Sequence, residues 1–225
     1  MGDFDLNLLM QRLAINIVPF IMAVVLHEFA HGFVASKWGD NTARDSGRLT
    51  MNPAPHMDLM GTVILPLMMF ATNSPILFGW AKPVPINPNR FKKYRSGLFW
   101  VSFAGPLMNI TLALLAAAFL CALLRFSSNE FYLYEPLFQM AQVAVGLNFS
   151  LAIFNLLPIP PLDGSKMIQS FLSYTATQKY EAMAQYSFWI ILALIMTGAI
   201  QIIGIPIHFL ATQSVNLMAH LFGLM

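Results

Sequence analysis

Charged side chains are scarce in this chain of 225 residues, since Asp, Glu, Lys and Arg together make up 10% of it and hydrophobic residues 57%. Soluble domains are about a quarter charged, because their surfaces face water. So few charges cannot cover a globule of this size. The composition therefore excludes an ordinary soluble domain and predicts an integral membrane protein.

Cysteine is nearly absent, because Cys121 is the single one. One thiol cannot form an internal disulfide, so nothing points to an oxidising compartment. The formal net charge is only +2, and no run of Lys and Arg with interleaved aromatics occurs, so nucleic acid is not an expected partner. The N-terminus also lacks the basic region and cleavage site of a signal peptide. We therefore expect the first apolar segment to remain in the mature protein.

Long apolar runs fill most of the chain. A spanning helix needs about 20 apolar residues, and five stretches meet this requirement: 8–36, 97–124, 137–157, 181–203 and 205–224. A sixth stretch, 59–79, is interrupted by Pro66 and contains the turn-forming sequence Thr72-Asn73-Ser74-Pro75, so it predicts either a crossing or a re-entrant hairpin. The expected fold is an all-α membrane protein with about five to six transmembrane helices.

The basic residues favour the hairpin. If 59–79 turns back, ten of the twelve Lys and Arg residues lie on one side of the membrane, with only Arg12 and Arg125 on the other. If 59–79 crosses, the five basic residues between 82 and 95 move to the opposite face. The positive-inside rule therefore predicts a re-entrant hairpin and places the basic-rich side in the cytoplasm.

The most informative motif is His27-Glu28-Phe29-Ala30-His31, which lies inside the first apolar run. Two histidines four residues apart share a helix face, and each can offer a neutral imidazole nitrogen to one metal ion. A glutamate beside the first histidine can hold a metal-bound water and accept its proton. Ionisable residues at membrane depth are costly, so these three indicate function rather than packing.

Catalytic zinc sites generally use three protein ligands. Asp163 is the strongest candidate for the third, because it follows the Pro-rich end of a span, where non-helical backbone is tolerated if it lines a cavity. N-capping of a short helix over 163–173 is an equally good interpretation. Packing explains the other histidines better than ligation does: His56, His208 and His220.

The membrane topology decides whether Asp163 can lie on the same side of the membrane as the two histidines. His27 lies ten residues before Lys37, about 15 Å inside the cytoplasmic end of its helix. Asp163 follows its own span, so the end of that span must also face the cytoplasm. A re-entrant 59–79 brings both ends to one side, whereas a full crossing separates them. This argument is independent of the charge distribution and agrees with it.

A different pattern occurs over 46–53, where polar and apolar side chains alternate between turn residues. The alternation predicts a short strand close to the membrane, and a cytoplasmic loop is an equally good interpretation. Repeats and flexible linkers are absent. We therefore expect a single membrane domain over 1–225, with a catalytic core at about 8–173 and accessory helices at about 181–224.

Two motifs, in this order and inside apolar segments, resemble those of the site-2 protease family of intramembrane zinc proteases: the HExxH at 27–31 and Asn155-Leu156-Leu157-Pro158-Ile159-Pro160-Pro161-Leu162-Asp163-Gly164. The sequence Ala104-Gly105-Pro106-Leu107-Met108-Asn109 is similar to the motif of the family's intervening span, and we interpret Gly105 and Asn109 as packing residues. The sequences at 47–53 and 79–88 resemble those of a compact bacterial subgroup without a PDZ domain.

The resemblance implies one zinc ion per chain, bound by His27, His31 and Asp163, with Glu28 as the general base. It also implies that Asn155 lies near the reaction centre, where its amide could stabilise the developing oxyanion. Substrate would bind as an added strand beside four residues of the β element: Arg48, Leu49, Thr50 and Met51.

The expected function is therefore cleavage of the transmembrane segments of single-span membrane proteins. The expected location is the bacterial cytoplasmic (inner) membrane, with the active site open to the cytoplasm and lipid as the surroundings. The sequence does not indicate the oligomeric state. The alternatives are a catalytically silent, protease-like scaffold, against which Glu28 argues, and a metal transporter, whose ligands would lie near the midplane on several helices.

Overall fold

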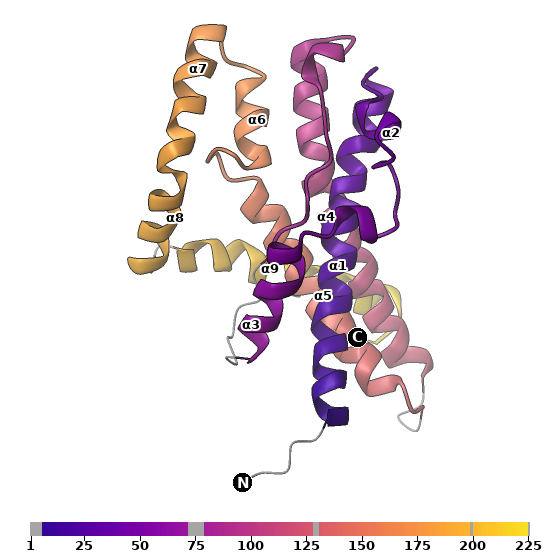
Figure 1. Ribbon diagram of the computed structural model, residues 1–225. Coiled ribbons are helices and arrows are strands. Elements are labelled where there is room, and N and C mark those ends of the chain that lie inside the picture. Colours follow the sequence, from indigo (N-terminus) through magenta and orange to yellow (C-terminus); the bar gives the residue numbers. More distant parts are fainter. Residues whose placement is uncertain (1–5, 72–78, 128–130, 199, 225) are drawn as a thin grey trace.

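Three long helices form the centre of the computed structural model, which describes residues 6–71, 79–127, 131–198 and 200–224. These helices are α1 (Leu6–Lys37), α4 (Tyr94–Phe126) and α5 (Tyr134–Asn155), and they pack against one another (Figure 1). The other helical elements are α2 (Thr42–Asp45), η1 (Ala54–His56), η2 (Leu59–Ile64), α3 (Leu65–Ala71), η3 (Pro88–Arg90), α6 (Asp163–Gln169), α7 (Tyr174–Ala182), η4 (Met183–Tyr186), α8 (Ser187–Met196) and α9 (Ile200–Leu221).

Small side chains bring the central helices close together. Ala113 and Ala117 of α4 are fully buried and pack against Val145 and Phe149 of α5. Lipid supplies no hydrophobic force between helices, so close packing at small residues contributes much of their association. On the other side of α5, a second apolar cluster joins it to α1, through Phe20, Val24, Val25, Leu147 and Leu151.

Four helices of the described residues are long and apolar enough to cross a membrane, rather than the expected five to six: Leu13–Lys37, Tyr94–Phe126, Tyr134–Asn155 and Gln201–Leu221. The expected span over 181–203 is wrong, because the chain there is divided among α7, η4 and α8. Regular helix α8 has only 10 residues, about 15 Å, which is half of a bilayer core. It is followed by Gly198, whose φ of +73° breaks the helix.

The two ends of the stretch 59–79 lie side by side. The N–H of Trp80 donates to the carbonyl of Gly61 at 3.1 Å, and the Thr62 hydroxyl donates to the Trp80 carbonyl at 2.7 Å. A hairpin requires such a return of the chain. Its expected turn, at 72–75, lies outside the described residues, so the re-entrant topology stays a prediction.

The residues over 46–53 form turns and bends, and within this described segment no strand is present. Their polar groups bond elsewhere. The Arg48 guanidinium donates to the carbonyl of Lys82 at 2.8 Å, and the carbonyl of Thr50 accepts from the imidazole of His56 at 2.8 Å. The membrane-associated β element is therefore not formed here, and its role in binding substrate stays a prediction.

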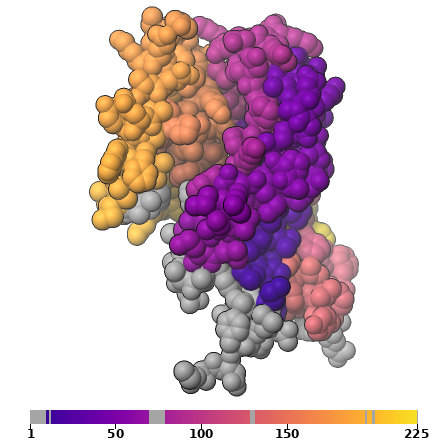
Figure 2. All heavy atoms as spheres, in the orientation of Figure 1, coloured from indigo at the N-terminus to yellow at the C-terminus, as the bar shows by residue number. Residues whose placement is uncertain are grey.

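The segment 79–88, which we call the strap, has no regular secondary structure before η3 and runs between α3 and α4 (Figure 1). It is tied on several sides. The N–H of Lys82 donates to the carbonyl of His56 at 2.8 Å, and the N–H of Asn87 donates to the Asp40 carboxylate at 2.6 Å. The space-filling view shows that the chain before α3 (purple) and the helices α6 to α8 (orange) lie next to each other on one face of the molecule (Figure 2).

The Asp40 carboxylate fixes the far end of the strap and predicts a pH-dependent stability. Its side chain is 0% exposed. Burial alone would raise the pKa of Asp40, but hydrogen bonds from the Thr42 hydroxyl and the Asn87 amide outweigh burial and lower it. A lowered pKa in the folded state means that ionised Asp40 stabilises the fold above the unfolded pKa of about 3.9, and that this contribution is lost as the pH falls through the lower, folded value.

The substitution Asp40→Asn should therefore destabilise the protein by about 1–3 kcal/mol near neutral pH. The difference from wild type should shrink below about pH 4, where the carboxylate of the unfolded chain binds a proton while that of the folded protein is still ionised. Thermal unfolding in detergent at pH 7 and at stepwise lower pH measures both effects. Asp45→Asn is the control, because the Asp45 side chain is 66% exposed. A difference that stays constant from pH 7 to pH 2 would contradict the assignment.

Candidate metal centre

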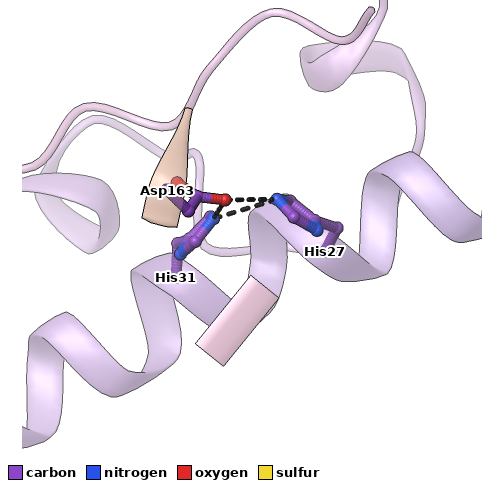
Figure 3. Close-up of side chains that lie close together, drawn as sticks. All are labelled: His27, His31 and Asp163. Atoms are coloured by element: carbon purple, nitrogen blue, oxygen red, sulfur yellow. Dashed lines mark hydrogen bonds and ion pairs between the residues drawn. The ribbon is translucent and has the colours of Figure 1, made fainter. Parts of the chain in front are cut away.

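His27, His31 and Asp163 converge on one buried point between α1 and the start of α6 (Figure 3). The Nε2 atoms of the two imidazoles lie 3.0 Å apart. The Asp163 Oδ2 atom lies 3.1 Å from Nε2 of His27 and 3.2 Å from Nε2 of His31. Asp163 follows His27 by 136 residues and His31 by 132 residues, and the three side chains nevertheless present their ligand atoms to the same space.

The break after α5 delivers Asp163 to this point. α5 ends at Asn155, and the prolines at 158, 160 and 161 prevent the helix from continuing. The N-cap of α6 is Leu162, in extended conformation, and Asp163 is the first helical residue. The capping interpretation of Asp163 is therefore wrong, since its carboxylate faces the two imidazoles instead.

In each imidazole, Nε2 faces the shared point and Nδ1 faces away from it. The hydrogen bond made by Nδ1 determines which of the two nitrogens carries the proton. Nδ1 of His27 donates to Oδ1 of Asn109 at 2.5 Å, and Nδ1 of His31 donates to the carbonyl of Val101 at 2.6 Å. A neutral imidazole with its proton on Nδ1 carries a lone pair on Nε2. Two nitrogen lone pairs and a carboxylate oxygen thus face one another, and this donor set fits a zinc ion.

Two residues of α4 shape the space around the donors. Gly105 leaves room for them, since a Cβ there would lie 2.4 Å from Nε2 of His31 and 2.5 Å from Nε2 of His27. Asn109 is fully buried and continues the network, because its Nδ2 donates to Oδ1 of Asn148 on α5 at 2.9 Å. Our interpretation of Asn109 as a packing residue missed its contact with His27. Its four-residue spacing from Gly105 places the two on one helix face, which was the available signal.

Replacing Asn109 should weaken zinc binding without touching a ligand. Outer groups that orient a ligating histidine are worth about 10–100-fold in metal affinity, so Asn109→Ala is expected to raise the zinc dissociation constant by that factor. Competition with a chromophoric chelator measures it. The control is Asn89→Ala, because Asn89 is exposed and lies in η3. An Asn109→Ala affinity within twofold of wild type would show that Asn109 does not orient His27.

Glu28 is held by the strap. Its Oε2 atom accepts the N–H of Val84 at 2.8 Å, and the side chain is half-buried. The strap is itself fixed by Arg48, whose guanidinium donates to the carbonyls of Lys82 and Pro83 at 2.8 and 3.3 Å. The carboxylate of Glu28, which is next to the first histidine in sequence, therefore has a defined position against the strap.

The other expected site residues make local contacts. Asn155 donates from Nδ2 to the carbonyl of Leu151, one turn back in its own helix, at 3.0 Å, and its place in the reaction stays a prediction. Of the three other histidines, His56 is fully buried and binds the loop at Thr50, as expected for packing. His208 and His220 are exposed on α9.

The sequence of this chain is similar to those of known proteins. Residues 132–198 match the model of peptidase family M50. The Bacillus subtilis (strain 168) protein named "Putative zinc metalloprotease YwhC" is 35% identical over 182 residues, which cover 80% of each chain. The Mycolicibacterium smegmatis protein named "Putative zinc metalloprotease Rip2" is 28% identical over 184 residues, covering 82% of this chain and 67% of the relative. No solved structure matches the chain.

The apolar helices and the buried donor set define a membrane metalloprotease. The chain belongs to peptidase family M50, the site-2 proteases, as its motifs indicated. Zinc is the cofactor of this group, and the cluster of His27, His31 and Asp163 agrees with it. The expected family, cofactor and membrane location are thereby confirmed.

Proposed function

We propose that the protein is a zinc endopeptidase that cleaves the transmembrane segments of other membrane proteins within or near the bilayer. The observation that carries this proposal is the meeting of Asp163 with His27 and His31, which lie next to Glu28 in a helix that is apolar enough to span a membrane. A scaffold has no need for a base held beside a metal site. A transporter would distribute its ligands along a path.

In the proposed mechanism, His27, His31 and Asp163 hold the zinc ion. When bound, zinc polarises the scissile carbonyl and lowers the pKa of water. Glu28 accepts the proton of the attacking water and passes it to the leaving amine. The bond from Val84 to Oε2 restrains the Glu28 carboxylate, which leaves Oε1 to receive the proton. Asn109 and Val101 keep the two imidazoles in the ligating tautomer.

The substrate has to unwind before it can be cut, because each carbonyl of a helix is bonded to the amide four residues on. We propose that the unwound segment binds in extended form beside Arg48, Leu49, Thr50 and Met51, through backbone hydrogen bonds that demand little of its sequence. Asn155 would stabilise the oxyanion. Met51 is 60% exposed, so a substrate could reach this segment.

Cleavage by the purified protein tests this proposal. The protein is reconstituted in liposomes with a panel of single-span substrates, and the products are mapped by mass spectrometry. We expect cuts inside or next to the apolar segment, loss of cutting with a zinc chelator and recovery on adding zinc. Cuts confined to soluble regions, or no zinc-dependent cut of any substrate, would contradict an intramembrane protease.

We also propose that the site opens to the cytoplasm of a bacterial inner membrane, because ten of the twelve basic residues lie on that side in the re-entrant topology. Arg44 and Lys92 are both exposed, and they lie before and after the stretch 59–79 in sequence. A membrane-impermeant maleimide should therefore label Arg44→Cys and Lys92→Cys from the same, cytoplasmic side. Labelling from opposite sides would exclude the hairpin.

A further inference from the structure

The helices after the metal site form a segment that stands beside the bundle in Figure 1. This segment, Tyr174 to Met196, comprises α7, η4 and α8, and we call it the arm. It replaces part of an expected transmembrane span, and the sequence predicts only accessory helices there. Its contacts nevertheless reach the chain that carries Asp163.

Two side chains of the arm donate hydrogen bonds to the loop between α5 and α6. The hydroxyl of Tyr180 donates to the carbonyl of Pro158 at 2.7 Å, and the hydroxyl of Ser187 donates to the carbonyl of Pro160. Burial raises the pKa of Tyr180, so its hydroxyl stays protonated and remains a donor.

Three of the four residues from 158 to 161 are prolines, which have no N–H to donate. The loop therefore cannot form the regular hydrogen bonds of a helix, and some of its carbonyls need partners from elsewhere. Pro158 and Pro160 lie five and three residues before Asp163. A shift of either carbonyl would move the backbone from which the Asp163 side chain projects. The arm therefore supplies partners at the two positions that set where this carboxylate points.

A small cleft lies between the arm and α6. Its volume is about 160 Å³, and its walls include Pro160, Ser165, Lys166 and Glu181. Nζ of Lys166 lies 3.7 Å from Oδ1 of Asp163, the oxygen that does not face the imidazoles. Lys166, a wall of this cleft, thus lies on the outer side of Asp163, while α1 presents the two histidines on its inner side.

We propose that Tyr180 and Ser187 are positioning residues for Asp163, so that the arm determines how tightly the metal centre holds its ion. This inference rests on the proposed role of Asp163 as a ligand. It has a consequence for regulation, because anything that displaces the exposed arm would loosen the third ligand without contacting the metal centre.

The rate of zinc loss to an excess of chelator tests the proposal, in Tyr180→Phe, Ser187→Ala and the double variant. Groups bonded directly to a ligating side chain change metal affinity by about 10–100-fold. Since these two act one step further out, we expect zinc loss to be about 3- to 10-fold faster in each single variant, and faster still in the double variant. The visible absorption of the cobalt-substituted proteins should shift in parallel, because it reports ligand geometry.

Tyr174→Phe is the matched control. Tyr174 lies on the same helix and is 77% exposed, and its hydroxyl contacts only the side chain of Gln178 in the recorded bonds. Its zinc loss should stay within twofold of wild type. If the double variant loses zinc as slowly as Tyr174→Phe and its cobalt spectrum is unchanged, the proposal is wrong. The single variants, each lacking one hydroxyl, decide the matter if circular dichroism shows that the double variant is unfolded.

Asp163→Ala separates this proposal from the one on which it rests. If Asp163→Ala keeps its zinc, the ligand assignment itself fails. If Asp163→Ala loses zinc while the Tyr180 and Ser187 variants match Tyr174→Phe, the ligand assignment survives and the positioning role alone is excluded.

Discussion

The substitution Glu28→Gln is expected to slow substrate cleavage by about 10²–10⁴-fold while zinc stays bound. Glutamine has the shape of glutamate, and its carbonyl oxygen can still accept the N–H of Val84, so the strap should keep its place. It cannot accept a proton from water. Because the ligands are unchanged, the loss should appear in the chemical step, with one zinc per chain retained.

The measurement combines the rate of cleavage in liposomes with zinc content by mass spectrometry. Glu135→Gln is the matched control, because Glu135 is exposed on α5 and contacts only Gln139 among the recorded bonds. Cleavage by Glu28→Gln within tenfold of the wild-type rate would show that Glu28 is not the base. Inactivity accompanied by loss of zinc would assign it a role in holding the metal instead.

The second large effect is expected for Asp163→Ala, which should lose zinc as well as activity. The carboxylate provides one of the three ligand atoms and the only negative charge among them. Two neutral imidazoles hold zinc poorly. The fall in affinity should therefore exceed the roughly 10–100-fold that outer groups contribute.

Zinc per chain after equilibrium dialysis in a zinc buffer measures this effect. Asp45→Ala serves as the control, because Asp45 is exposed and makes only a 4.0 Å contact with Arg90 among the recorded ion pairs. Full zinc occupancy in Asp163→Ala would remove Asp163 from the ligand set. The carboxylate would then act only through its contacts with the histidines.

The metal centre was largely predictable from the sequence. The spacing of His27 and His31 places both on one helix face, and the prolines before Asp163 predict the break between its own short helix and the preceding span. The charge distribution and the position of each span predict that these residues lie on the same side of the membrane. The spacing of the histidines and the positions of the prolines are local features of the sequence. The positive-inside rule applies to the whole chain but needs only one sequence.

The contacts that orient the site were not predictable. Asn109 lies 82 residues from His27, and Val84 lies 56 residues from Glu28. No local pattern reports that an amide or a backbone N–H will meet a particular partner at such a distance. The donor at residue 84 belongs to the backbone, so the type of side chain at that position carries no signal for it.

The accessory helices show why apolar runs alone mislead. The stretch 181–203 has the composition of a span, but its length is divided by η4 and Gly198. Ser187, the first residue of α8, also donates its hydroxyl to the carbonyl of Pro160 in the loop before α6. Composition reports only that a segment avoids water, so it does not determine whether the segment forms one long helix.

X-ray absorption at the zinc edge tests the central claim most directly, because it reads the ligands of the ion itself. The purified protein loaded with one zinc per chain should show two imidazole nitrogens at about 2.0–2.1 Å and oxygen at about 2.0–2.2 Å. The imidazole signal should fall in His31→Ala. A wild-type spectrum without imidazole scattering, or an unchanged one in His31→Ala, would contradict the assignment of His27, His31 and Asp163 as the metal ligands.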